Sequence, residues 1–145
     1  MTIATSHDIR LDTWERLQAD AKTIRFEVFV DEQKVPAEIE LDEMDAHCLH
    51  AVAYDAVGTP VGTGRLLPDG HIGRMAVRKS ARGSGVGGAL LQALMAVARE
   101  RGAPAVELSA QTQAAPFYVQ HGFVIDGDGF MEAGIAHVTM RRVFS

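Results

Sequence analysis

Four glycines lie within residues 83–88, between two segments whose apolar residues follow different regular patterns. Residues 71–77 before them have the apolar character of a β-strand, whereas residues 86–101 after them repeat apolar residues on one face of a helix. Gly102 and Pro104 supply the stop signals expected at the end of a helix. The sequence therefore predicts a strand, a glycine-rich turn and a helix, in that order.

The glycine-rich turn is suited to binding phosphate. Glycine lets the backbone approach a ligand closely because it has no Cβ atom, and the following helix offers unpaired N–H groups at the positive end of its dipole. Arg78, Lys79 and Arg82 add positive charge beside the turn. The alternative is a plain connection into a core helix, but glycines within a helix cost about 1 kcal/mol each, so we favour a pyrophosphate site. Its expected residues are Arg82, Gly83, Ser84, Gly85, Val86, Gly87 and Gly88.

The spacing of the glycines can be compared with the motifs of known phosphate-binding turns. Residues 83–88 match the dinucleotide fingerprint G-x-G-x-x-G, and Glu107 follows on the next predicted strand. A nucleoside-triphosphate loop is excluded because the sequence contains no G-x-x-x-x-G-K-[ST]. A dinucleotide-binding fold needs repeated β–α–β units, whereas the strands predicted on both sides of this region are joined by hairpins. The predicted fold therefore argues against NAD as the ligand of this turn.

Composition predicts one domain spanning residues 1–145, with 47% apolar and 23% charged residues. No segment approaches the ~20 apolar residues of a membrane span, and residues 1–10 are too polar for a secretory signal, so we expect a cytoplasmic protein. The net charge of −5 argues against nucleic acid as a partner. Cys48 is the single cysteine, expected as a buried apolar residue. No ligand cluster of metal-site spacing occurs, and we predict no metal.

The predicted elements alternate between strands and helices. Asp12 and Glu15 resemble a capping box at the first helix, and residues 24–30 fit either a helix or a strand. The fold class is therefore α/β (α+β), with a mixed central sheet of about 6–7 strands and helices on both faces. Besides the elements given above, strands are expected at 7–11, 46–54, 61–67, 105–109, 123–131 and 135–143, and a short helix at 114–120.

The turn also matches a second signature. R-G-S-G-V-G at 82–87 fits [QR]-x-x-G-x-[GA] after a strand ending M-A-V, and A-P-F-Y at 115–118 is followed by H-G-F at 121–123. In this order and separation, these segments resemble the two landmarks of the GNAT N-acetyltransferase superfamily. R-F-E-V-F-V-D-E-Q at 25–33 is similar to the R-x-x-V-F-x-x-E-Q opening of its ElaA-like branch, which implies a helix ending near Glu32. The likeness covers nearly the whole chain.

This resemblance implies transfer of an acetyl group from acetyl-CoA to an amine, with both substrates bound together. The strand residues Met75, Ala76 and Val77 would lend backbone groups to the pantetheine arm, and the glycine turn would take the pyrophosphate. Two neighbouring strands, at 73–77 and 106–109, would splay apart around the thioester. Tyr118 matches the tyrosine that protonates or hydrogen-bonds the leaving thiolate. Phe117 and Gln111 are further coenzyme-binding residues by the same likeness, Gln111 through the A-Q pair at 110–111.

The general base and the acceptor are less constrained. His71 is our candidate base because histidine exchanges protons near neutral pH, with Glu32, Glu38 and Glu40 as rivals. We expect His50 and His137 to be structural. Residues 31–45 hold seven acids and one lysine, and this local charge would attract a cationic amine. The expected acceptor-binding residues are Phe29, Glu32, Glu38 and Arg74.

Three questions stay open at the level of sequence. Arg74 either contacts an anionic group of the acceptor or pairs with an acid of residues 31–45. The acceptor is a small-molecule or protein amine, and the resemblance allows a homodimer formed through sheet edges or C-terminal strands. A non-catalytic acyl-CoA-binding or sensing domain is the alternative function, and it would keep the same phosphate site.

Overall fold

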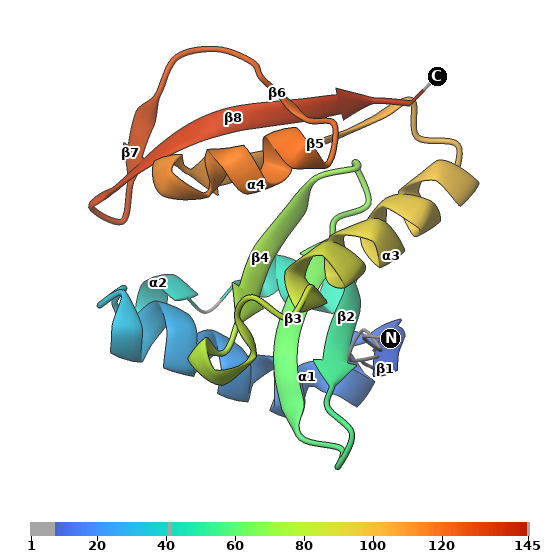
Figure 1. Cartoon of the computed structure of the whole chain (residues 1–145), viewed down its shortest axis with the longest axis vertical. Coiled ribbons are helices and arrows are strands. Elements are labelled where there is room, and N and C mark those ends of the chain that lie inside the picture. The colour runs from blue at the N-terminus through green and yellow to red at the C-terminus, as the bar shows by residue number, and fades with distance from the viewer. Residues whose placement is uncertain (1–7, 41, 145) are drawn as a thin grey trace, which may run out of the picture.

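The computed structural model describes residues 8–40 and 42–144 and contains two four-stranded antiparallel sheets (Figure 1). The first sheet has the strand order β1-β2-β3-β4, and in the second β8 lies between β5 and β6 and also pairs with β7. The strands are β1 (Asp8–Thr13), β2 (Leu49–Tyr54), β3 (Pro60–Leu66), β4 (Ile72–Val77), β5 (Ala105–Gln111), β6 (Val124–Ile125), β7 (Phe130–Glu132) and β8 (Ile135–Val143).

The helices lie on both faces of the sheets. Helix α1 (Trp14–Arg25) continues directly into a π-helical segment, η1 (Phe26–Glu32), in which the Gln33 N–H donates to the Val28 carbonyl at 3.1 Å. This outcome resolves the ambiguity of residues 24–30 in favour of a helix, which ends at Glu32 as the resemblance implied. The other helical segments are α2 (Ala37–Glu40), η2 (Glu43–His47), η3 (Lys79–Ala81), α3 (Val86–Glu100), η4 (Thr112–Ala114) and α4 (Ala115–Gln120).

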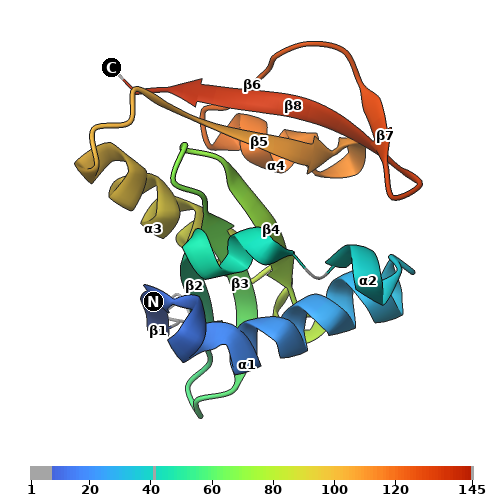
Figure 2. The same ribbon diagram turned by 180° about the vertical axis from the view of Figure 1, so that it is seen from behind.

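The two sheets meet at β4 and β5 and then diverge, as Figures 1 and 2 show. Within the described residues, a parallel bridge between His71 and Glu107 is the ladder contact that joins them. The predicted fold class and the splayed strands are therefore confirmed. The refinement is that the sheet is divided into two antiparallel halves rather than continuous.

Two apolar cores hold the helices against the sheets. Residues Leu90, Leu91 and Leu94 of α3 are fully buried against one face, because their spacing puts them on one side of the helix. Leu17, Ala21 and Ile24 of α1 pack on the opposite face of the first sheet in a second cluster. Cys48 is buried, as predicted for a small apolar side chain.

Three local predictions are corrected. The expected capping box at Asp12 and Glu15 is absent from this helix start: α1 begins at Trp14 after an extended Thr13, and Asp12 instead accepts a hydrogen bond from the Thr13 N–H at 2.7 Å. The strand predicted at 46–54 begins only at Leu49, because η2 occupies the preceding residues. The strand predicted at 123–131 is divided into β6 and β7, since Gly127 between them has a φ of +101°.

The first predicted strand, 7–11, is found as β1, but His7 lies outside the described residues. In the part of the chain that the structure describes, every helix is too short or too polar to cross a bilayer.

Candidate active site

A cleft of about 700 Å³ lies where β4 and β5 diverge, with η1 and the β7–β8 hairpin contributing further walls. Ten of the predicted site residues line it, which brings together segments from most of the chain. These ten are Phe29, Glu32, His71, Arg74, Met75, Ala76, Val77, Arg82, Gln111 and Tyr118. Phe117, Glu38 and the glycine turn lie outside this lining.

Strand β4 carries a bulge at the centre of the cleft. Arg74 has a φ of +51°, a left-handed conformation that is uncommon for a non-glycine residue. The register of β3 with β4 shifts between Thr63 and Arg65, as expected where one strand holds an extra residue. In the described chain, the bridge at His71, just before β4, is the ladder contact with β5. The backbone groups of β4 that face the cleft are therefore not paired with β5. The sequence analysis missed this bulge, although Gly64 and Gly73 inside strand patterns are its signal.

The glycine turn has the geometry of an anion site. Gly85 caps α3 with a φ of +86°, and a Cβ atom added there would meet nothing within 4 Å, so its side toward solvent is open. The first α3 bond to this cap runs from the Ala89 N–H to the Gly85 carbonyl at 3.1 Å. The N–H groups in the first turn of α3, before Ala89, therefore have no intrahelical acceptor. A Cβ atom built on Gly87 would lie 3.5 Å from the Phe117 ring, so Phe117 lies beside the turn.

The arginines predicted next to the phosphate are paired with carboxylates of η1. The Arg82 guanidinium donates to both Glu32 oxygens at 2.9 Å and to the Val77 carbonyl at 3.0 Å. Arg78 donates to both Glu27 oxygens, at 2.8 and 3.1 Å. These pairs fasten the turn and the end of β4 to η1. The charges expected beside a phosphate are thus already paired within the protein.

Tyr118 on α4 is buried in the cleft wall, with 8% of its surface exposed. Its ring makes edge contacts with Phe117 and Phe123, at centroid distances of 5.0 and 5.8 Å. Burial raises the pKa of Tyr118 to about 12, because an ionised phenolate would lose its hydration there. The hydroxyl therefore stays protonated across the neutral range and can donate a hydrogen bond.

His71 lies at the junction of the two sheets, where both of its ring nitrogens face carboxylates. Nδ1 is 3.0 Å from Asp69 and Nε2 is 3.3 Å from Glu107. This arrangement links β4 to β5 at the closed end of the splay. The base role of His71 stays a prediction, and it would require one of these contacts to open.

Side chains at the ends of η1 and β5 meet beside the cleft. The amide of Gln111 donates to Gln33 at 2.7 Å and receives a second bond from it at 3.4 Å. Phe29 and Glu32 line the cleft next to them, whereas Glu38 is an exposed residue of α2 outside it. His137, which the sequence analysis assigned to structure alone, also lines the cleft. The described residues contain no group of three His, Cys, Asp or Glu side chains able to hold a metal ion.

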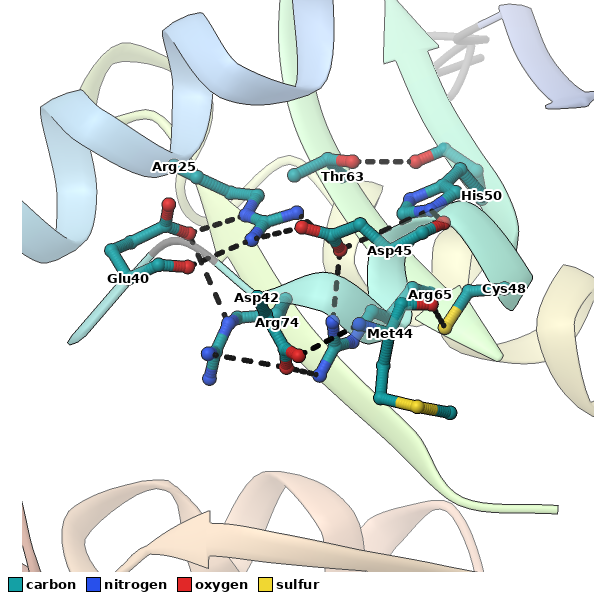
Figure 3. A network of polar contacts seen from close by, with 11 residues as sticks. Arg25, Glu40, Asp42, Met44, Asp45, Cys48, His50, Thr63, Arg65 and Arg74 are labelled. Atoms are coloured by element: carbon teal, nitrogen blue, oxygen red, sulfur yellow. Dashed lines mark hydrogen bonds and ion pairs between the residues drawn. The ribbon is translucent and has the colours of Figure 1, made fainter. Parts of the chain in front are cut away.

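The acidic segment 31–45 is partly neutralised by a buried network (Figure 3). Arg25 pairs with Glu40 and with Asp45, the latter at 2.9 Å, and Arg65 bridges Asp45 and Asp42 at 2.8 and 2.7 Å. Together with Glu32, which Arg82 binds, four of the seven acids are thus held by arginines rather than directed at an acceptor. This finding weakens the steering expected from the sequence.

Arg74 completes this network from β4. Its guanidinium lies 3.6 Å from Asp42 and 3.9 Å from Glu40 (Figure 3), so the pairing alternative holds for Arg74 in this structure. Burial opposes ionisation of Asp42, but the Met44 N–H and the Arg65 guanidinium outweigh it and lower the pKa of the carboxyl. Asp42 is therefore charged at neutral pH.

Comparison with known proteins agrees with this geometry. The family model for the acetyltransferase (GNAT) domain matches residues 15–144. An uncharacterised N-acetyltransferase of Bacillus subtilis, YjcF, is 46% identical over 127 residues, which cover 85% of this chain and 90% of the relative. The crystal structure of an acyl-CoA N-acyltransferase from Pseudomonas aeruginosa has a TM-score of 0.83 at 31% identity, covering 95% of this chain and all of that chain.

Escherichia coli ElaA has a similar fold, with a TM-score of 0.82 at 24% identity and coverage of 94% of this chain and 99% of that one. The resemblance drawn from the two sequence landmarks is therefore confirmed. The chain belongs to the GNAT acetyltransferase family.

Proposed function

We propose that this protein transfers the acetyl group of acetyl-CoA to a primary amine bound in the cleft between β4 and β5. The proposal is supported by the order in which three features follow one another along β4 and the cleft. The open glycine turn lies at one end, the unshared edge of β4 runs along the middle, and the buried Tyr118 hydroxyl lies in the wall. A coenzyme A thioester has a diphosphate, two amides and a sulfur in the same order.

The residues present fit such a coenzyme. Amides of residues 83–88 would hold the diphosphate, since a Cβ-free backbone approaches it closely. Backbone groups of Met75, Ala76 and Val77 would bind the pantetheine amides as an added strand does. Arg82 supports the turn by its bonds to Glu32 and to the Val77 carbonyl, and Gln111 and Phe117 border the path.

In direct transfer the amine adds to the thioester carbonyl, and the C–S bond then breaks. The sulfur needs a hydrogen-bond donor as it takes the electron pair, and Tyr118 supplies one within a water-poor wall. The amine enters from the side where η1 and the β7–β8 hairpin line the cleft. Phe29 offers it an apolar contact.

The test is release of thiol from acetyl-CoA by the purified protein with a panel of amines that includes polyamines, amino sugars and lysine peptides. We expect release that depends on one class of amine. Binding of acetyl-CoA without release for any amine would indicate the non-catalytic acyl-CoA-binding alternative. Thermal stabilisation by NAD and not by acetyl-CoA would overturn the coenzyme assignment. Longer acyl-CoA donors in the same assay define the acyl group.

A further inference from the structure

The β5–β8 pair presents two different faces to the cleft. Side chains alternate along a strand, and Leu108 and Ala110 of β5 join Tyr118 in the core on one face. Gln111 belongs to the other face, where its amide bonds Gln33 at the end of η1. His137 of β8 lies directly opposite Gln111 in the ladder, so both side chains emerge on this second face.

This arrangement separates the leaving group from the nucleophile. Tyr118 and the glycine turn share the side of α3 and α4, because Phe117 of α4 contacts the start of α3. His137 is on the side of η1, where the acceptor-binding residues are expected. An amine that adds to the face of the thioester carbonyl turned toward η1 would therefore meet His137 and not Tyr118.

The ring of His137 is held in one orientation. Nδ1 lies 2.7 Å from the Ile135 carbonyl, which can only accept, so Nδ1 carries the hydrogen of the neutral ring. Nε2 then has the lone pair. The ring stacks on Phe130 at a centroid distance of 5.7 Å and is 8% exposed, and Nε2 is 3.7 Å from the Glu132 carboxylate.

We propose that His137 is the general base of the reaction, acting through Nε2 on the acceptor amine; this assignment rests on the proposed acetyl transfer. One N–H proton of the amine passes to Nε2 as the C–N bond forms. The C–S bond then breaks, the sulfur takes the electron pair beside Tyr118 and receives a proton from solvent. The imidazolium is stabilised by Glu132, whose side chain is 58% exposed, and it returns its proton to water there.

Other ionisable groups near the cleft do not offer the same geometry. The ionisable side chain in contact with the His137 ring among the described residues is Glu132 on β7. Tyr118 of α4 stays protonated, Arg74 of β4 is a cation, and Glu32 of η1 is paired with Arg82. His71 has carboxylates at both nitrogens, whereas His137 directs one nitrogen to a carbonyl and keeps the other for a proton.

The test compares pH profiles of kcat/KM for wild type, His137→Gln and His71→Gln, with His47→Gln on exposed η2 as the control. We expect His137→Gln to lower kcat about 10²–10⁴-fold and to abolish the fall of kcat/KM at low pH (the acid limb). The affinity for acetyl-CoA should change less than about twofold. His71→Gln retains the acid limb, and His47→Gln matches wild type. Imidazole added to His137→Gly restores part of the rate.

Glu132→Gln provides a second measurement that does not depend on replacing a buried side chain. Loss of this carboxylate destabilises the imidazolium, so the acid limb should move to lower pH while the fold is retained. An unchanged acid limb in both His137→Gln and Glu132→Gln, with wild type still releasing thiol, overturns the base assignment alone. Wild type that releases no thiol with any amine overturns acetyl transfer and the base role together.

Discussion

The environment of Tyr118 determines what its hydroxyl can do. With a pKa raised to about 12 by burial, the phenol is a weaker acid than a thiol, whose usual pKa is about 8.5. Complete proton transfer to a thiolate would be uphill by roughly 5 kcal/mol at 1.36 kcal/mol per unit. In the proposed transfer, the hydroxyl would therefore act as a hydrogen-bond donor that stabilises charge on sulfur as the C–S bond breaks.

Removing that donor should slow the chemical step without weakening coenzyme binding. We expect Tyr118→Phe to lower kcat about 10²-fold, with the acetyl-CoA dissociation constant within about twofold of wild type by calorimetry. Because the hydroxyl remains protonated, wild type should show no loss of kcat through Tyr118 below about pH 10. The matched control is Tyr54→Phe, since Tyr54 also has a pKa raised to about 12 but bonds Asp20 outside the cleft.

A Tyr118→Phe variant with wild-type turnover would remove this role. An equal loss in Tyr54→Phe would show that the effect is one of general stability. Either result is visible in steady-state rates once the melting temperatures of both variants are known.

At the scale of elements, helix α3 has a left-handed glycine at each end, and one of them, Gly85, belongs to the proposed phosphate site. Gly85 has a φ of +86° and Gly102 a φ of +84°, and a Cβ atom at either would meet nothing within 4 Å. An alanine therefore introduces the same backbone strain at both ends. The pair separates the contribution of backbone geometry to stability from its contribution to binding.

We expect Gly85→Ala and Gly102→Ala each to lower the free energy of unfolding by about 1–2 kcal/mol. Gly85→Ala alone should weaken binding of CoA, by roughly tenfold or 1.4 kcal/mol, because its methyl group enters the space the diphosphate needs. Chemical denaturation and calorimetry with CoA measure the two effects. Equal CoA affinity in both variants would exclude the turn as the diphosphate site.

The segment from α2 to η2 is fastened to α1 by Arg25, which is 1% exposed. Its guanidinium reaches Glu40 of α2 and Asp45 of η2. A buried carboxylate that loses its partner keeps the cost of its own desolvation. Arg25 therefore holds together two short elements that have little apolar surface of their own.

We expect Arg25→Met to lower the free energy of unfolding by roughly 3–5 kcal/mol, as found when one partner of a buried pair is removed. Arg16→Met on the same helix is the control: Arg16 is 3.9 Å from Asp12 and 77% exposed, so its loss should cost under about 1 kcal/mol. Urea denaturation measures both. Similar losses for the two variants would refute a dominant role for the buried network.

On the scale of the whole molecule, the two antiparallel sheets share one bridge within the described residues, and the cleft lies between β4 and β5 beyond it. A coenzyme in that cleft would contact β4, α3 and α4 at once, so it would connect the two halves. Binding should therefore stabilise the molecule as a whole. It should also slow amide hydrogen exchange where β4 and β5 face the cleft.

With acetyl-CoA at about 100 times its dissociation constant, the expected stabilisation is about 2.7 kcal/mol, or roughly 5–10 °C in melting temperature. Amide hydrogen exchange should slow at β4 and at the end of β5, with β1 and β2 as internal controls. Protection spread evenly over β1 and β2, with none added at β4, would contradict binding between the sheets.

Features that depend on local backbone preference could be predicted from the sequence. The helix at α3 and its stop before Gly102 follow from neighbours in the chain, and the structure confirms both. The splayed strands came from the family resemblance. Local signals suffice here because a positive φ or a helix stop is decided within a few residues.

Contacts between side chains far apart in the sequence could not be predicted from it. Arg82 pairs with Glu32 across 50 residues, and Gln111 with Gln33 across 78. Glu40 and Asp45 proved to be buried partners of Arg25, and His137 proved to line the cleft, because β8 lies between β5 and β7. Such pairings depend on which strands become neighbours, and strand order is set by packing of the whole chain rather than by any short segment.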